Sequence, residues 1–234
     1  MVKAPPPYLR TWNRVMNPQG NGQHDRPGLV PTGQAIEESS FRIIDAEAGH
    51  HPFPEEQWQV VRRVIHTTGD FEYRDLMHFH PLAITAGVAA LRRGAPIFTD
   101  TRMIQTGLAP WRLGWYGNRV VTPSAAPESQ QWAEALGTTR SVAAFRHSAG
   151  RMEGSIVAVG NAPTALFEAV RMILEERIRP ALIIGVPVGF VQAAESKEAL
   201  RKLTDQPSIT VFGRKGGSAV AVAITHALLE LARV

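Results

Sequence analysis

The sequence predicts an α/β fold in which helices cover both faces of a mainly parallel central sheet. Short apolar runs recur along the chain, and stretches with helical spacing of apolar residues follow most of them. Such alternation of strand and helix is typical of parallel sheets. The length of 234 residues is sufficient for one sizeable core, so we expect one globular domain.

The first periodic stretch, Glu55–His66, is predicted to be a helix. Gly69 follows it as a stop signal, which places His66 in the last turn. Carbonyl groups left unpaired at a helix end favour the protonated imidazolium, and this form suits a general acid near neutral pH. The alternative is that His66 only caps the helix. The apolar residues at helical spacing are Trp58, Val61, Val64 and Ile65.

The elements that follow repeat one pattern. A second helix is expected over residues 80–93, opening at Pro81 and broken by the turn at 94–96, and the strand Ile97–Asp100 comes next. A further helix begins at Arg140, after hydroxyl residues that favour helix N-caps. The remaining strands are expected in four apolar runs, at residues 119–122, 155–160, 181–186 and 209–213.

The N-terminal residues 1–33 are expected to form an extended or disordered arm. They contain many prolines and glycines and few apolar side chains to bury. The alternative is an arm that docks on a partner through Tyr8, Leu9 and Trp12. The folded domain is therefore assigned to residues 34–234.

The composition restricts the class of protein. The chain has no cysteine, which excludes disulfides and thiolate chemistry. No run of about 18 apolar residues occurs, so we expect neither a membrane span nor export, and a cytoplasmic location. The formal charge is +4, and the basic residues are scattered rather than clustered. Nucleic acid is therefore a weak inference, and the excess of arginine fits a small polyanionic ligand equally well.

Three glycine-rich loops follow predicted strands, at residues 160–166, 185–191 and 213–218. In open parallel sheets, ligands bind beyond the carboxyl ends of the strands. Glycine lets the backbone approach a ligand closely, and free N–H groups at a helix start bind carboxylate or phosphate oxygens. We therefore expect a broad anionic ligand on this rim; the alternative is that the loops are only tight turns. The candidate contacts are Gly160, Asn161, Thr164, Gly189, Phe190, Gly216 and Gly217.

Other motifs narrow the chemistry. The chain lacks the Walker spacing, a G-x-G-x-x-G after a strand, and a G-x-S-x-G elbow, which disfavours nucleotide enzymes and α/β-type serine hydrolases. The pairs His50-His51 and His78/His80 lack a third ligand at a diagnostic spacing, so no metal site is predicted. Arg140, beside Thr139, is placed to bind a carboxylate bidentately; the alternative is an ordinary surface arginine.

Six motifs in order give the chain a specific resemblance. They are Ser40-Phe41-Arg42-Ile43-Ile44, Val64-Ile65-His66 with Gly69-Asp70, Gly94-Ala95-Pro96-Ile97, Thr138-Thr139-Arg140-Ser141, GNAPTAL at 160–166 and GVPVGFVQAAESK at 185–197. Over residues 33–234 the chain resembles the precorrin-8X methylmutase family, including its cobalt-precorrin-8 members. These are isomerases of corrin-ring (cobalamin) biosynthesis.

The resemblance implies a flavodoxin-like three-layer sandwich, a homodimer and a corrinoid substrate. It implies transfer of a methyl group from carbon 11 to carbon 12, giving hydrogenobyrinate or its cobalt form. No separate cofactor is implied, since cobalt, if present, belongs to the substrate. In the family, a histidine matching His66 donates and accepts the proton, a serine matching Ser40 contacts the substrate, and an arginine matching Arg140 lies at the active site.

Two further segments bear on the comparison with the family. The segment Pro110–Asn118 has no close counterpart in the family pattern, and we interpret it as a lid, a dimer contact or a packed connection. The run Thr67–Phe71 is more similar to the cobalt-dependent branch. The alternative to catalysis is a corrinoid or tetrapyrrole carrier in which His66 only contacts or ligates the ring.

Overall fold

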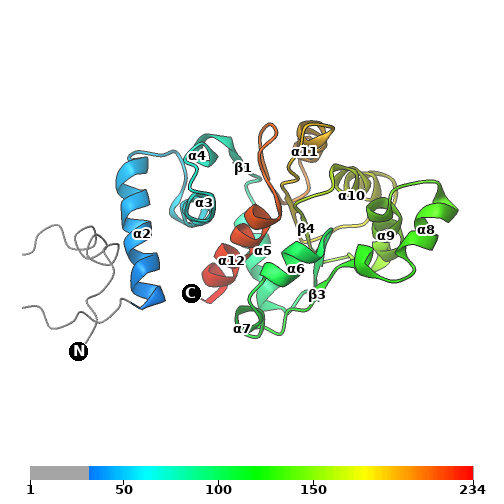
Figure 1. Cartoon of the computed structure of the whole chain (residues 1–234), viewed down its shortest axis with the longest axis horizontal. Coiled ribbons are helices and arrows are strands. Elements are labelled where there is room, and N and C mark those ends of the chain that lie inside the picture. The colour runs from blue at the N-terminus through cyan, green and yellow to red at the C-terminus, as the bar shows by residue number, and fades with distance from the viewer. Residues whose placement is uncertain (1–31, 234) are drawn as a thin grey trace, which may run out of the picture. The chain divides into compact units, whose positions relative to one another are not determined.

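A computed structural model describes residues 32–233 of the chain (Figure 1). Of these, residues 39–233 belong to one compact unit and residues 32–38 to another. Helix α2 (Gly33–Ala48) runs across the boundary between the two units. The predicted arm, residues 1–33, lies outside the described residues except for its last two.

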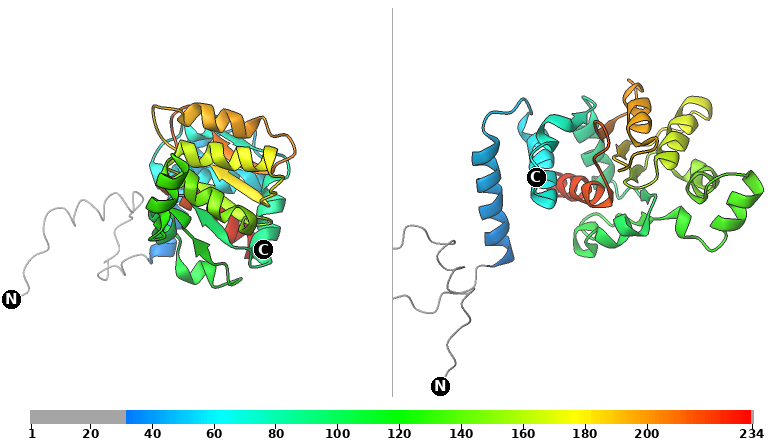
Figure 2. Two further views of the ribbon diagram at one scale, coloured as in Figure 1. Left: turned by 90° about the vertical axis from the view of Figure 1, so that its right-hand side faces the viewer. Right: turned by 45° about the horizontal axis from the view of Figure 1, so that its top comes forward.

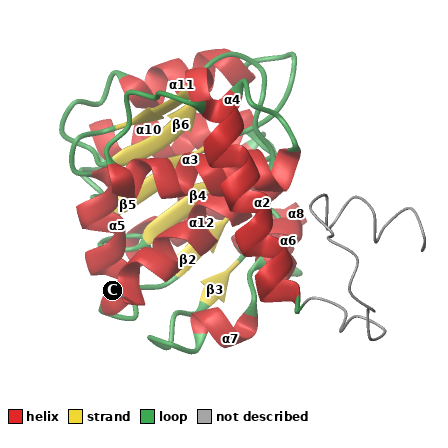
Figure 3. Cartoon of the chain, turned by 90° about the vertical axis from the view of Figure 1, so that its left-hand side faces the viewer, coloured by secondary structure: helices red, strands yellow, loops and turns green. Residues whose placement is uncertain are grey.

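The central sheet has six strands and is parallel except at one edge (Figure 3). Their spatial order is β1-β6-β5-β4-β2-β3, and only the β1–β6 pair is antiparallel. Without β1, the order read from the other edge is that of a flavodoxin-like sheet. The strands are β1 (Met77–Phe79), β2 (Ile97–Thr99), β3 (Val120–Val121), β4 (Ile156–Val159), β5 (Leu182–Gly185) and β6 (Ser208–Val211).

Helices cover both faces of the sheet, which confirms the predicted architecture (Figure 2). In β4, Ile156 and Ala158 pack into one core while Val157 and Val159 pack into the other. Both faces are therefore apolar, which is why the strands read as continuous apolar runs. One layer contains α3 (Glu55–Thr68), α5 (Ala83–Arg92), α6 (Arg102–Gly107) and α12 (Ser218–Arg233). The other contains α9 (Arg140–Ser148), α10 (Pro163–Glu175) and α11 (Ala193–Arg201).

The predicted boundaries hold to within a few residues. Helix α3 extends to Thr68, and Gly69 closes it in the left-handed conformation with φ 65°. Helix α5 begins at Ala83 rather than at the predicted proline, because residues 80–82 form a turn before it. Short elements that the sequence did not indicate are α4 (Tyr73–Leu76), α7 (Pro110–Leu113), α8 (Ser129–Leu136), η1 (Pro123–Ala125) and η2 (Ala149–Arg151).

The unmatched segment Pro110–Asn118 is a packed connection between α6 and β3. The Arg112 guanidinium pairs with Glu230 at 3.0 Å, and the Tyr116 hydroxyl donates to the Ala232 carbonyl. Asn118 donates to the carbonyls of two residues near the end of α5. These contacts tie the segment to the C-terminal half of α12 and to the end of α5, although Trp111 remains 60% exposed.

Candidate active site

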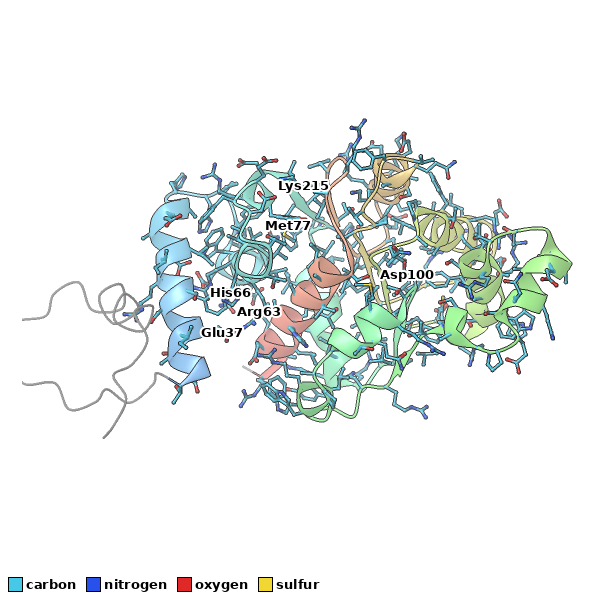
Figure 4. All side chains as sticks on the ribbon, in the orientation of Figure 1. Glu37, Arg63, His66, Met77, Asp100 and Lys215 are labelled. Atoms are coloured by element: carbon cyan, nitrogen blue, oxygen red, sulfur yellow. The ribbon has the colours of Figure 1, made fainter. Side chains whose placement is uncertain are left out.

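His66 lies in the last turn of α3, as predicted, with an exposed side chain (Figure 4). The helix end is closed by local donors: the Thr67 and Thr68 hydroxyls bond to carbonyls one turn back, and the Gly69 N–H bonds to Ile65. The imidazole faces the edge of the Phe41 ring, with ring centroids 5.2 Å apart. Ser40 is the residue before this phenylalanine on α2 and is half-buried. The histidine is thus held on a rigid helix end and remains accessible.

A mostly apolar cavity of about 270 Å³ opens beside the His66 turn. Arg63 and Thr67, which flank His66 on α3, form one wall, and α6 and α12 form the others. A flat hydrophobic ligand would find apolar contact here next to a titratable group. We call this the apolar cavity; its lining from α6 and α12 is Met103, Gly107, Ser218, Ala219, Val222, Ala223 and His226.

The carboxyl ends of β2 and β4 are joined by one buried carboxylate. Asp100 accepts hydrogen bonds from the backbone N–H groups of Gly160 at 3.0 Å, Asn161 at 2.9 Å and Ala162 at 2.6 Å. Burial raises the pKa of Asp100, and the three N–H donors oppose that shift. The expectation that this loop offers free N–H groups to an anionic ligand is therefore wrong, because the protein's own carboxylate already occupies them.

A polar basin of about 550 Å³ lies beyond these strand ends. β2 and β4 are the strands at which the chain changes direction across the sheet, so the basin occupies the topological switch point, where ligands of this fold class bind. Arg140 and Asn161, both predicted ligand contacts, line it together with Arg102. The Thr139 hydroxyl caps α9 through the Val142 N–H. It also lies 3.4 Å from the Thr164 hydroxyl.

The loop before α12 contacts the chain just after β5 and the turn that follows the His66 helix. The Gly217 N–H donates to the Val186 carbonyl, and a Cβ on Gly216 would collide with that same carbonyl, so glycine is required for the close approach. Lys215 forms ion pairs with Asp70 and, at 2.9 Å, with Glu72, which follow the His66 helix (Figure 4). Gly216 and Gly217 are therefore held against the end of β5, and Lys215 holds the turn after His66 against the loop.

A buried lysine supports the same loop from the other side of the sheet. Lys197 on α11 is 2% exposed, and its ammonium donates to the Lys215 carbonyl at 2.7 Å. Burial lowers the pKa of Lys197 to about 8. The glycine-rich loop is thus held by side chains from two different layers.

The predicted loop at residues 185–191 points outward. Phe190 is 84% exposed and follows Gly189, and the Arg214 guanidinium lies 5.2 Å from the centre of its ring. Neither residue lines the apolar cavity or the polar basin. The structure therefore brings Gly160, Asn161, Thr164, Thr139 and Arg140 together, while Gly189 and Phe190 stand apart from them.

His80 and His51 have structural roles. His80 accepts from the Leu82 N–H and bonds to the Thr204 carbonyl, and His51 stacks on Trp58 with ring centroids 4.0 Å apart. Among residues 32–233, no cluster of three or more His, Asp or Glu side chains is placed to hold a metal ion. Over the same residues, no helix has both the length and the apolar character needed to cross a bilayer.

Two features of the site were not predicted from the sequence: the apolar cavity with Met103, and Arg102 in the polar basin. Met103 is 71% exposed and lines the apolar cavity, and Arg102, its neighbour, lines the polar basin. Neither belongs to a motif, because both depend on how α6 is seated between β2 and α12. One signal was available: the pair follows directly after Asp100-Thr101, at the carboxyl end of a predicted strand.

Known proteins match nearly the whole described region. The precorrin-8X methylmutase family matches residues 35–231. A cobalt-precorrin-8 methylmutase from Leptospira interrogans is 47% identical over 87% of this chain and 96% of its own. A precorrin-8X methylmutase from Pseudomonas aeruginosa is 44% identical, covering 85% of this chain and 96% of that protein. The solved precorrin-8X methylmutase from Thermus thermophilus has a TM-score of 0.80 and 50% identity, covering 86% of this chain and 96% of its own.

Proposed function

Because this chain belongs to the precorrin-8X methylmutase family and is an isomerase of cobalamin biosynthesis, we propose the step that it performs. It moves a methyl group from carbon 11 to carbon 12 of precorrin-8X or cobalt-precorrin-8, giving hydrogenobyrinate or cobyrinate. His66 acts as the acid and the base of this step. The observation that carries the proposal is an exposed histidine on a rigid helix end beside an apolar cavity.

The reaction balances without a second reactant. The His66 imidazolium gives a proton to the conjugated macrocycle, which leaves an electron-poor centre next to the migrating methyl group. The methyl group then shifts with its bonding electron pair, and the neutral imidazole takes a proton back from the ring. No oxidant, reductant or group carrier enters the balance, so we propose that the enzyme needs no separate cofactor. Cobalt, if present, belongs to the substrate.

The macrocycle's two kinds of surface match the two hollows of the site. The ring is flat and largely apolar, and it suits the apolar cavity beside His66. Its edge carries acetate and propionate carboxylates, which suit Arg140 in the polar basin. We propose that Ser40, Thr139, Asn161, Thr164 and the glycines 160, 189, 216 and 217, with Phe190, are further substrate contacts.

We further propose a cytoplasmic homodimer. Met103 and Trp111 are 71% and 60% exposed, and large apolar side chains of this kind favour protein interfaces. Sedimentation velocity of the full chain is expected to give the mass of a dimer. A monomer mass throughout the concentration range would contradict this part of the proposal.

The test of catalysis compares two histidine variants of the full chain. His66→Ala is expected to lower the turnover of precorrin-8X by about 100-fold or more, because a positioned proton donor contributes roughly 10²- to 10⁴-fold. Binding of hydrogenobyrinate, followed by its visible absorption, should change little. His50→Ala, at an exposed histidine before α3, is the matched control and should keep full turnover.

Turnover retained by His66→Ala would refute histidine catalysis. Binding of hydrogenobyrinate by the unmodified chain without any turnover would favour the non-catalytic corrinoid-binding protein instead. The absorption spectrum of corrinoid that copurifies with the chain would report whether the ring contains cobalt.

A further inference from the structure

The polar basin contains two arginines that come from different elements. Arg102 is the first residue of α6 and Arg140 is the first residue of α9, and both line the same hollow of about 550 Å³. Both side chains are exposed. The fold brings them together, since α6 follows β2 and the cap residue of α9, Thr139, lies 3.4 Å from Thr164 at the start of α10, which follows β4.

Within residues 32–233, neither guanidinium lies within ion-pair distance of a carboxylate. Arg102 donates to the Ala125 carbonyl at 3.1 Å, which orients the side chain but leaves its charge uncompensated. The basin's acidic residue is Asp100, and its two oxygens already accept three backbone N–H groups. The lining therefore has two guanidinium groups, and none of its carboxylate oxygens is left to pair with them.

Other arginines of this chain show what such a group does when a carboxylate is available. Arg146 and Arg171 both bind Glu168, at 3.0 Å and 2.6 Å, and Arg201 pairs with Glu198. Arginine presents planar, bidentate donors that fit a carboxylate, whereas lysine offers a point charge. The guanidinium groups of Arg102 and Arg140, which line one basin, are therefore arranged to bind an anion from outside the protein.

We propose that Arg102 is a specificity-determining residue that binds a peripheral carboxylate of the corrinoid in the polar basin, beside the carboxylate site of Arg140. This assignment rests on the proposed function, since it takes the corrinoid as the ligand. It makes the basin a two-arginine site for the edge of the ring. Recognition of adjacent carboxylates then selects corrinoids whose side chains are free acids over those whose side chains are amides.

The experiment is a charge series at position 102 of the full chain. Arg102→Lys, Arg102→Gln and Arg102→Glu are titrated with hydrogenobyrinate, at low and at high ionic strength. Lys and Gln both keep a donor for the Ala125 carbonyl, so a merely structural role would be largely retained in them. Arg93→Gln, at an exposed arginine that ends α5, is the matched control.

Affinity is expected to fall in the order Arg, Lys, Gln, Glu. The Gln variant should bind about tenfold more weakly than the unmodified chain, as expected for the loss of one charge-assisted bidentate contact. The differences should shrink at high ionic strength, since the site is open to solvent. The control should bind as the unmodified chain does.

Equal affinity across the series, or a loss in the Gln variant that is independent of salt, would overturn the assignment of Arg102. Turnover of precorrin-8X by the unmodified chain separates the two proposals. If it isomerises the substrate while the series is flat, only the role of Arg102 fails. If it neither binds nor isomerises a corrinoid, the proposed function and this inference both fail.

Discussion

The polar basin and the apolar cavity lie on the two sides of the short helix α6, yet they are built on opposite principles. Among the described residues, the two arginines of the basin have no carboxylate partner, and the basin's own carboxylate has oxygens already bonded to backbone N–H groups. The cavity is formed largely by small and apolar side chains of α6 and α12. The basin thus offers charge to a ligand, and the cavity offers shape and apolar area.

In the proposed function, the two regions also have different roles: the basin binds the edge of the substrate, and His66 beside the cavity transfers the proton. The basin lies at the switch point of the sheet, which is a general ligand position in this fold class. His66 lies on α3, a helix that precedes the parallel strands and is tied to the loop before α12 by Lys215. The proposed proton donor therefore lies on a helix that precedes the parallel strands, whereas the proposed carboxylate-binding site lies at the carboxyl ends of two of those strands.

Loss of the Asp100 charge should damage the basin most. In Asp100→Asn, the amide –NH₂ would face backbone N–H donors, so at least one buried donor would lose its acceptor. We expect a loss of about 3 kcal/mol of unfolding free energy and a Tm lower by roughly 10 °C. Thermal unfolding followed by circular dichroism measures this. Asp205→Asn, at an exposed aspartate, should unfold as the unmodified chain does.

A charge placed in the apolar cavity should make this region polar like the basin and weaken binding of the corrinoid ring. Ala219 is exposed in the first turn of α12, where an aspartate is compatible with the helix. Ala219→Asp should weaken hydrogenobyrinate binding about 30-fold, because the carboxylate would have to be desolvated beneath the ring. Absorption titration gives the affinity, and Ala89→Asp on α5 is the control. Unchanged affinity would mean that the ring does not cover this cavity.

The buried Lys197 tests the glycine-rich loop before α12. Its pKa is about 8 in the folded chain and about 10.4 when exposed, so between these values the unfolded chain binds the extra proton. Stability should therefore rise with pH from about 8 to about 10 in the unmodified chain. Lys197→Met should lack a rise on the order of 1 kcal/mol, measured by urea unfolding at both ends of the range. Parallel pH profiles for the two proteins would contradict this prediction.

Elements with a local cause were predictable from the sequence. The end of α3 at Gly69 follows from the left-handed glycine, and the Thr139 cap of α9 follows from a hydroxyl before a helical stretch. Because β4 and β5 are buried on both faces, their apolar runs were visible without knowledge of their neighbours. The carboxyl-end loops could then be placed on one rim by the rule for parallel sheets.

Features that depend on pairing were not predictable. Strand β1 has three residues and is recognisable only from its antiparallel partner, with His78 opposite Thr210. The Asp100 cap joins residues about sixty positions apart, and nothing local in the glycine loop reveals that its N–H groups are occupied. The apolar cavity likewise exists only once α3, α6 and α12 are packed together.

Helix α6 sets the two chemistries of the site by its rotation alone. Arg102 and Met103 are consecutive, and about 100° around the helix axis directs one to the basin and the other to the cavity. With α6 held in place, one residue inserted between β2 and α6 would move Arg102 to the position of Met103, beside the cavity, and would take this arginine out of the basin. The number of residues in this two-residue connection is therefore a constraint on the evolution and redesign of the enzyme, independent of which side chains the helix presents.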